Sequence, residues 1–194
     1  MQRMILAALV IGSPLAAQSW ELGLFAGQQS YKSVDAFGVS AEPKGKTVLG
    51  ARVGYSVVDL GPALFQLTAG FQPKTEATIE VNGVNFGDKF QHQHMSVGAM
   101  FNFKAGVAFG AGIEYRFEKL NVTNSGLSDT SYNRPWLRAN VGYAIPSPVV
   151  KPFIGLEVAL PLMSKSFSTT ASDEDNMKAS APKLQIGLYG GIRF

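Results

Sequence analysis

Residues 183–194 read KLQIGLYGGIRF, and in this stretch two kinds of residue alternate with a period of two. A period of two is that of a β-strand, whose side chains point alternately to the two faces of a sheet. The stretch therefore predicts a strand with one apolar face and one polar face. The apolar face carries Leu184, Ile186, Leu188, Gly190, Ile192 and Phe194, and the opposite face carries Gln185, Gly187, Tyr189, Gly191 and Arg193.

Seven other stretches of the chain alternate in the same way. Together with residues 183–194 they make eight segments. Each is about ten residues long, which is the length that a tilted strand needs to cross the hydrocarbon layer of a membrane. The seven stretches are Trp20–Gln28, Thr47–Val57, Ala63–Gln72, Phe90–Lys104, Val107–Glu118, Arg134–Ile145 and Pro152–Leu162.

The connections between these segments alternate in length. Short turns on one side and long loops on the other side are typical of outer-membrane barrels. We therefore predict an all-β fold, an eight-stranded antiparallel up-and-down transmembrane β-barrel over residues 20–194, with both termini and the short turns in the periplasm. The long connections are Tyr31–Lys46, Lys74–Lys89, Asn121–Asn133 and Lys165–Pro182, and the short ones are Asp59–Pro62, Lys104–Gly106 and Ser147–Lys151.

The first residues of the chain predict a signal peptide over residues 1–19. Arg3 is followed by the apolar run Met4–Ile11 and then by small residues up to Ala17, which is the order of a charged region, a hydrophobic region and a cleavage site. We expect cleavage after Ala17 or Ser19. The apolar run is too short to span a bilayer as a helix, and a buried N-terminal helix is the alternative.

The composition excludes several classes of function. Charged residues make up 16% of the chain, below the average of about 25% for soluble domains. The absence of Cys excludes disulfides, Cys-based zinc sites and thiol catalysis. The net charge of +3 is dispersed and forms no basic stripe, so we expect no nucleic-acid partner. We also expect no cofactor and no metal, since no third ligand accompanies the two His residues.

A soluble β-sandwich or a lipocalin-type barrel would also show alternating strands. In a soluble barrel, however, the apolar side chains point inward and charged side chains cover the outside. Here one face of the segments is apolar without interruption, whereas the other carries glycine, polar and charged residues. The apolar face must therefore meet lipid, and we expect the protein in the bacterial outer membrane, in contact with the lipid bilayer and with lipopolysaccharide.

The polar face of the segments carries both signs of charge. An eight-stranded barrel is narrow enough for side chains to fill its interior, and an unpaired buried charge costs several kcal/mol. We therefore expect Arg–Glu pairs to seal the lumen, with Glu21 next to Arg193 because the last strand must close on the first. Glu80 lies in a predicted loop, and its facing is open. The predicted lumen charge network consists of Glu21, Arg52, Glu114, Arg116, Glu118, Arg138, Glu157 and Arg193.

Aromatic residues lie near the ends of the segments on the apolar face. In outer-membrane barrels, aromatic rings form a girdle at each of the two membrane interfaces. We predict one girdle on the turn side, which includes Phe194, and one on the loop side. The predicted girdle residues are Trp20, Tyr55, Phe65, Phe71, Phe103, Phe109, Tyr115, Phe117 and Tyr143.

With its signal, its eight alternating segments, its alternating loop lengths and its terminal GGIRF, the chain resembles the small eight-stranded outer-membrane barrels: the OmpA-like transmembrane domain and its short OmpX- and OmpW-type relatives. The resemblance covers residues 20–194. In that family the barrel-assembly machinery reads a C-terminal strand that ends in an aromatic residue, which implies that Ile192 and Phe194 form an assembly signal here. Tyr189 stands where the commonest version of that signal has Gly. Because a closed barrel has no free edge, we expect a monomer.

Two functions without catalysis are compatible with such a barrel. The first, which we favour, is a structural barrel whose long loops contact surfaces or partners. The second is a channel for small solutes, or for hydrophobic compounds that pass through a lateral opening. Pro135 and Pro161 lie within predicted strands and could mark weak strand pairing, although each could equally mark a strand end or a bulge.

A third function is a lipid-modifying enzyme. His94 and Ser96 resemble the His-x-Ser of the lipid A deacylase barrels, where His, Ser and Glu act together, because a Ser nucleophile needs a base and a third, orienting group. By the predicted alternation these two residues face inward, whereas lipid chemistry needs the outer surface. Val97 and Gly98 also stand where that family has Asn and Gly. We therefore expect no enzymatic activity and no catalytic residues.

Overall fold

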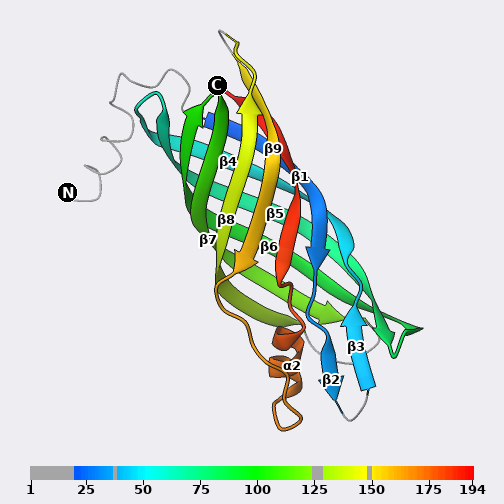
Figure 1. The fold of residues 1–194 in the computed structure, drawn as a ribbon. Coiled ribbons are helices and arrows are strands. Elements are labelled where there is room, and N and C mark those ends of the chain that lie inside the picture. Colours follow the sequence, from blue (N-terminus) through cyan, green and yellow to red (C-terminus); the bar gives the residue numbers. More distant parts are fainter. Residues whose placement is uncertain (1–19, 37–38, 124–128, 148–149) are drawn as a thin grey trace, which may run out of the picture.

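The computed structural model describes the chain except for residues 1–19, 37–38, 124–128 and 148–149, so the predicted signal peptide lies outside the described residues. The strands form a closed antiparallel barrel, as predicted (Figure 1). Neighbouring barrel strands follow one another along the chain, and the last strand closes on the first. The barrel strands are β1 (Trp20–Ser30), β4 (Lys46–Asp59), β5 (Ala63–Val81), β6 (Val84–Ala105), β7 (Val107–Val122), β8 (Thr130–Ala144), β9 (Lys151–Pro161) and β10 (Leu184–Arg193).

The two ends of the barrel differ, as the loop lengths predict. At the end that we call the turn end, the strands are joined by short turns, and the backbones of Trp20 and Phe194 exchange two hydrogen bonds of 2.9 Å. The opposite end, the loop end, carries the long connections together with β2 (Val34–Ala36), β3 (Val39–Pro43) and the helix α2 (Asp173–Ala179) (Figure 1).

The predicted long loops contain more regular structure than the sequence indicated, and the loop assignment of Lys74–Lys89 is wrong. Strands β5 and β6 run on through this stretch and meet at a turn made by Asn82 and Gly83, whose φ angles are 50° and 79°. An Asn-Gly pair with positive φ at both residues forms the tight turn that matches the twist of two paired strands. Glu80, left open by the sequence, lies in this extension and pairs with Lys44 on the surface at 3.2 Å.

Three further departures from the predicted loops lie at the loop end. The connection Tyr31–Lys46 holds β2 and β3, and β8 begins at Thr130 rather than at Arg134. The connection Lys165–Pro182 holds α2, where the Ser172 side chain caps the N-terminus by accepting a hydrogen bond from the Asp175 backbone N–H at 3.2 Å.

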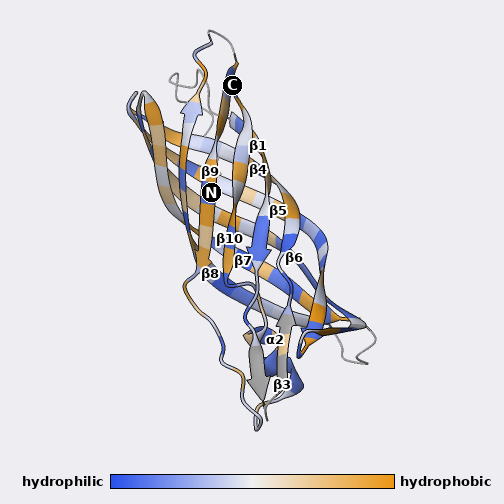
Figure 2. Ribbon diagram, turned by 45° about the vertical axis from the view of Figure 1, so that its right-hand side comes forward, coloured by the Kyte–Doolittle hydropathy of each residue, from blue (hydrophilic) through white to orange (hydrophobic). Residues whose placement is uncertain are grey.

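The exterior of the barrel is apolar. Along β1 the burial alternates residue by residue, with Leu22 and Leu24 exposed between buried inward-facing neighbours. Leu24 is 69% exposed and Phe109 is 56% exposed, which only a lipid environment makes favourable over so wide a surface. Figure 2 shows the apolar residues on the strands of the wall, whereas α2 is largely hydrophilic. Among the described residues, no helix is both long enough and apolar enough to cross a membrane.

The wall is split between β4 and β5 near the loop end. The cross-strand pairs of these two strands begin with Asp59 opposite Leu64 and end with Ala51 opposite Phe71. The wall closes again where the Lys44 backbone N–H donates to Thr78 O at 2.9 Å. Between these points, no ladder pairing joins residues 45–50 to residues 72–77 within the described part of the chain. Pro73 has no N–H to donate, and it lies in the register shift between Gln72 and Thr75.

The two prolines considered from the sequence do not mark this opening. Pro135 pairs with Tyr115 inside the β7–β8 ladder, and its carbonyl accepts a hydrogen bond from the Leu162 N–H at 2.9 Å. Pro161 is the last residue of β9 and pairs with Trp136. Proline is tolerated at a strand end, so neither position interrupts the wall.

Candidate functional site

Charged side chains that contact one another fill the lumen. The alternation of each strand places them on the face opposite the lipid-facing residues. Five guanidinium groups and four carboxylates face inward among the described residues: those of Arg52, Arg116, Arg134, Arg138, Arg193, Glu21, Glu114, Glu118 and Glu157. They form three groups along the barrel axis.

The central group joins strands that lie across the lumen from each other. Arg52 on β4 donates two hydrogen bonds to Glu157 on β9, at 2.7 and 2.8 Å, although β1 and β10 separate these strands in the wall. Arg138 donates to Glu114 Oε2 at 2.8 Å, and its Nε lies 3.8 Å from Glu157 Oε2. Arg116 Nε donates to the other oxygen of Glu114. Three guanidinium groups therefore share two carboxylates.

Glu118 is the centre of the second group, nearer the loop end. Its two oxygens accept from Arg134 Nε at 2.9 Å and from Arg134 Nη2 at 3.0 Å. Oε1 also accepts from the indole N–H of Trp136 at 2.7 Å. His92 Nε2 lies 3.3 Å from Oε2 but is not aligned for a hydrogen bond. The planar guanidinium of Arg134 thus holds the carboxylate at two points, which is the arrangement that favours Arg in buried pairs.

The indole ring of Trp136 connects the first two groups. The guanidinium carbon of Arg116 lies 3.9 Å from its centroid, and that of Arg134 lies 4.9 Å from it. A cation over an aromatic face is attracted by the ring quadrupole. Trp136 therefore stabilises two buried cations by its ring while its N–H stabilises the Glu118 anion.

Glu21 is the centre of the third group, near the turn end. It accepts hydrogen bonds from the Tyr189 hydroxyl, from Arg193, and from Gln66 at 3.2 Å. The register places Glu21 directly opposite Arg193 at the seam between β1 and β10. Glycine at position 23 makes room for Tyr189, because a Cβ there would lie 2.4 Å from the tyrosine ring.

A chain of side-chain amides crosses the lumen beside these charges. Arg116 Nη1 donates to Gln185 at 2.6 Å, Gln185 donates to Gln72 at 3.4 Å, and Gln72 donates to Gln29 at 3.2 Å. The four side chains come from β7, β10, β5 and β1. Buried polar groups are costly unless they are hydrogen-bonded. This chain satisfies one amide with the next as far as Gln29, whose Nε2 is buried without a partner.

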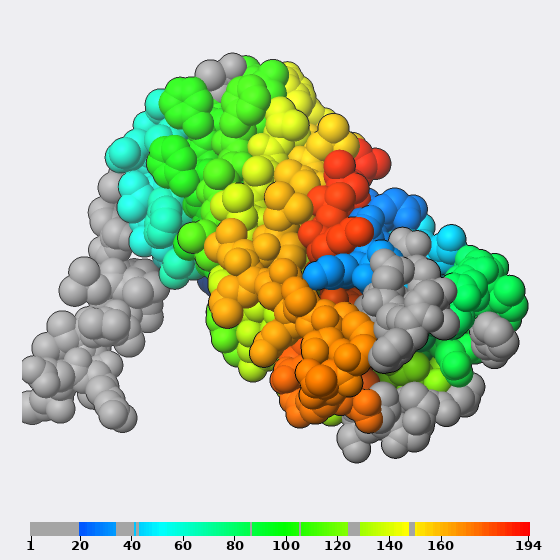
Figure 3. Space-filling model, turned by 60° about the horizontal axis from the view of Figure 1, so that its bottom comes forward, coloured from blue at the N-terminus to red at the C-terminus, as the bar shows by residue number. Residues whose placement is uncertain are grey.

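An apolar cluster closes the lumen at the loop end, and we call it the apolar cap. Met177 of α2 packs into it, and Arg134 fastens the adjoining segment by donating to the carbonyls of Pro182, at 2.6 Å, and Met163, at 3.3 Å. In Figure 3 the loop end is turned forward, and atoms of the segment around α2 cover part of it. The cap consists of Tyr31, Ala77, Phe90, Leu120, Tyr132, Met177 and Ala181.

All eight residues of the predicted lumen charge network face the lumen, and each contacts a group of opposite charge. The pairs are Arg52–Glu157, Arg116–Glu114, Arg138–Glu114, Arg193–Glu21 and Arg134–Glu118.

Arg134 is the lumen charge that the sequence prediction missed. It is only 1% exposed and is the partner of Glu118. The period of two that assigns Trp136 and Arg138 to the lumen also assigns Arg134 to it. Pro135 hides this signal, because proline usually marks the edge or the end of a strand.

His94 and Ser96 face the lumen and are buried, with exposed fractions of 7% and 6%. His94 Nδ1 has no hydrogen-bond partner. An enzyme of the lipid A deacylase type needs these side chains at the lipid-facing surface, where the structure does not place them. No group of three or more metal-ligating side chains is found in the described part of the chain.

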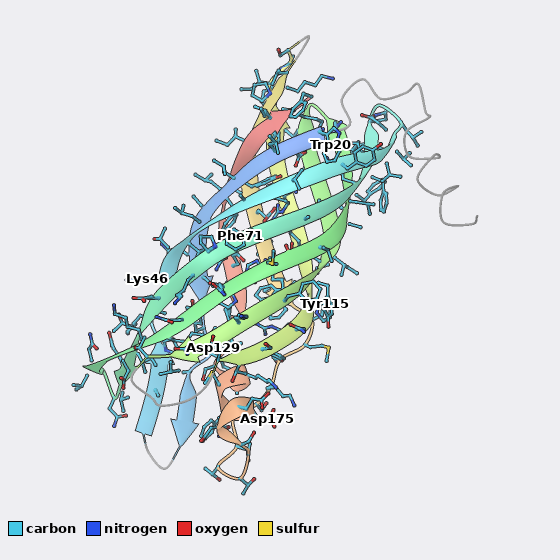
Figure 4. The ribbon with its side chains drawn as sticks, turned by 180° about the vertical axis from the view of Figure 1, so that it is seen from behind. Trp20, Lys46, Phe71, Tyr115, Asp129 and Asp175 are labelled. Atoms are coloured by element: carbon cyan, nitrogen blue, oxygen red, sulfur yellow. The ribbon has the colours of Figure 1, made fainter. Side chains whose placement is uncertain are left out.

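The predicted girdle and assembly residues lie on the outside of the barrel. Trp20 packs on Tyr55 near the turn end with their ring centroids 5.0 Å apart, and Tyr115 packs on Phe117 at 5.3 Å. Figure 4 labels Trp20, Phe71 and Tyr115 on the wall. The remaining predicted residues on this outer surface are Phe65, Phe103, Phe109, Tyr143, Ile192 and Phe194.

Two cavities adjoin the charge network. The turn-end cavity has an empty volume of about 610 Å³, part of it open to solvent, and contains the side chains of Lys104, Arg138 and Arg193 in its lining. The side cavity, of about 300 Å³, lies beside the split in the wall, where Gly50 and Phe71 line it together with Arg116. The central group and the amide chain lie between the two.

The comparisons with known proteins rest on structure alone, since no protein-family model and no curated protein sequence matches the chain. A major outer membrane protein from Thermus thermophilus aligns over 91% of this chain and 99% of that chain, with a TM-score of 0.56 and 16% sequence identity. Neisserial surface protein A aligns over 90% of this chain and 94% of that chain, with a TM-score of 0.49 and 12% identity. OprG from Pseudomonas aeruginosa aligns over 91% of both chains, with a TM-score of 0.49 and 8% identity. The chain has the fold of the small eight-stranded bacterial outer-membrane barrels.

Proposed function

We propose that this protein is a structural, surface-interacting barrel of the bacterial outer membrane whose lumen is sealed by Arg–Glu pairs. The observation that carries the proposal is the central group, in which Arg52 binds Glu157 across the lumen while Arg116 and Arg138 bind Glu114 beside that pair. Separating a buried pair costs about 3–5 kcal/mol, so the pairs keep the lumen closed to ions. The apolar cap closes the loop end a second time.

The loop end supplies the surface for contacts outside the membrane. The β5–β6 hairpin, the β2–β3 hairpin and α2 all lie at this end, which faces outward if the short turns lie in the periplasm. Their side chains would contact lipopolysaccharide, other cells or partner proteins. The apolar belt contacts the lipid bilayer, and Ile192 and Phe194 at the opposite end would be read by the barrel-assembly machinery during insertion.

The test is ion conductance of the purified protein in planar lipid bilayers. We expect the wild-type barrel to give no steady conductance. The Arg52→Ser variant, which removes a cross-lumen pair, should conduct, and Lys119→Gln, which changes an exposed residue on the outside of β7, should not. Steady wild-type conductance that is unchanged in Arg52→Ser would contradict the sealed lumen.

A second candidate function is lateral passage of small hydrophobic compounds, favoured by the split between residues 45–50 and 72–77 and by the side cavity next to it. The Gly50→Leu variant would narrow this opening, because Gly50 lines the cavity and a Cβ added there would lie at an acceptable 3.4 Å from Phe71 O. Uptake of a hydrophobic fluorescent probe by proteoliposomes should then fall. Uptake equal to that of protein-free liposomes would rule this function out.

A further inference from the structure

The lumen holds more positive than negative charge. In the central group, Arg52, Arg116 and Arg138 face only Glu114 and Glu157, and the most exposed of these five side chains, that of Arg52, is 11% exposed. Arginine stays protonated in proteins, so the surplus charge persists. A buried charge without a partner costs several kcal/mol. An anion bound nearby would offset that cost.

The turn-end cavity adjoins this surplus charge. Arg52 and Arg138 reach its inner wall, and Arg193 and Lys104 lie at its mouth, where β10 and β6 end. Its lining includes one carboxylate, that of Glu21, which already accepts three hydrogen bonds. The lining therefore carries four cationic side chains and one carboxylate, and the cavity has space that an anion could occupy.

Two cations at the mouth retain unused hydrogen-bonding capacity. Arg193 Nε is buried and has no partner, although Arg193 Nη2 binds Glu21. The ion pair of Lys104 with Asp59 is long, at 3.9 Å. Lys151 is the cross-strand partner of Arg193, so its side chain belongs to the same face of the wall. Three strands thus bring three cationic side chains to one mouth.

We propose that the turn-end cavity binds a phosphate group that enters from the turn end. A multiply charged oxyanion suits a site where guanidinium and ammonium groups converge from several strands, because each oxygen accepts charge-assisted hydrogen bonds. The phosphate is either free in solution or the headgroup of an anionic phospholipid in the adjoining leaflet. This site is separate from the loop-end contacts proposed above, and it does not depend on them.

The first experiment titrates the purified protein, in an uncharged detergent, with inorganic phosphate at constant ionic strength. A parallel titration with sodium chloride is the reference. NMR follows the Arg Nε–H signals and the amides of Gly142 and Gly155, which line the cavity. We expect saturable shifts, and the Lys104→Gln/Lys151→Gln double variant should bind phosphate about tenfold more weakly. The control Lys119→Gln changes an exposed residue near the loop end and should bind as the wild type does.

The second experiment distinguishes the two sources of phosphate. The protein is placed in nanodiscs of phosphatidylcholine, with or without phosphatidylglycerol. If free phosphate is silent but phosphatidylglycerol shifts the same signals, and the double variant weakens that effect, the headgroup is the ligand. The proposal is overturned if neither source shifts the cavity signals. It is also overturned if the double variant, like the control Lys119→Gln, binds as strongly as the wild type does.

Discussion

Replacing Glu118 by Gln is the sharpest test of the energetics of the lumen. The Glu118 and Arg134 side chains are 0% and 1% exposed, and the carboxylate accepts three hydrogen bonds, two from Arg134 and one from Trp136. The amide of Gln has nearly the same shape, so the substitution removes charge without leaving a large cavity. It leaves the Arg134 cation buried without a carboxylate, with only neutral acceptors: the new side-chain amide oxygen and the carbonyls of Pro182 and Met163.

The size of the expected effect follows from this environment. Removing one partner of a buried ion pair costs about 3–5 kcal/mol. With a urea dependence of about 2 kcal/mol per M, the midpoint of unfolding falls by about 2 M. The Glu118→Gln/Arg134→Gln double variant no longer buries an unpaired charge, so it should recover at least half of the loss, which a double-mutant cycle reports as coupling.

The assay is reversible urea unfolding in lipid vesicles, followed by tryptophan fluorescence, because Trp136 contacts both partners. The control is Glu76→Gln, which breaks the Glu76–Lys89 ion pair of 2.8 Å on the exposed hairpin and should leave the midpoint in place. A Glu118→Gln midpoint within about 0.3 M of the wild type would refute the reasoning. So would a double variant whose loss equals the sum of the two single losses.

Three other variants test the seam, the cap and the assembly signal. Gly23→Val would push the Tyr189 ring off Glu21, since the valine Cβ would lie 2.4 Å from that ring. The refolding yield should therefore fall, and a yield equal to that of the wild type would contradict the tight contact. Met177→Asp buries a carboxylate in the apolar cap, so limited proteolysis should cut around α2 while the barrel strands stay protected; unchanged resistance would count against the cap. Deleting Phe194 should lower the amount of protein in the outer membrane while detergent-refolded protein keeps its β-sheet circular dichroism, and normal membrane levels would argue against a signal role.

The barrel is predictable from sequence because its two faces meet different surroundings. Lipid outside and packed polar groups inside force every crossing strand to alternate, so a stretch such as residues 183–194 reveals both its strand and its lipid-facing side. The same reasoning finds the Glu21–Arg193 neighbours, because closure must bring β10 beside β1. Beyond the membrane this contrast disappears. Residues 74–81 continue β5 with polar residues on the outside, so their sequence lacks the apolar alternation of a membrane strand and predicts a loop.

The partners inside the lumen are harder to predict than the residues that face it. Alternation assigns Arg52 to the lumen but does not select Glu157, which comes from a strand three places away around the wall. That choice depends on the stagger of the strands and on the reach of two long side chains. The loop-end closure depends in the same way on Met177, which belongs to a helix that the loop composition did not indicate.

The split in the wall and the seal of the lumen lie at the same level of the barrel, and their chemistry decides between the two candidate functions. A hydrophobic molecule that entered beside Gly50 would meet Gln72, His94 and Arg116 in the side cavity. Entry would strip water from these polar groups without offering them new hydrogen bonds. Passage beyond the cavity would also require Arg116 to leave Glu114 and Gln185, at the cost of a broken buried pair. The split therefore ends in a polar pocket, which favours the sealed barrel over lateral passage.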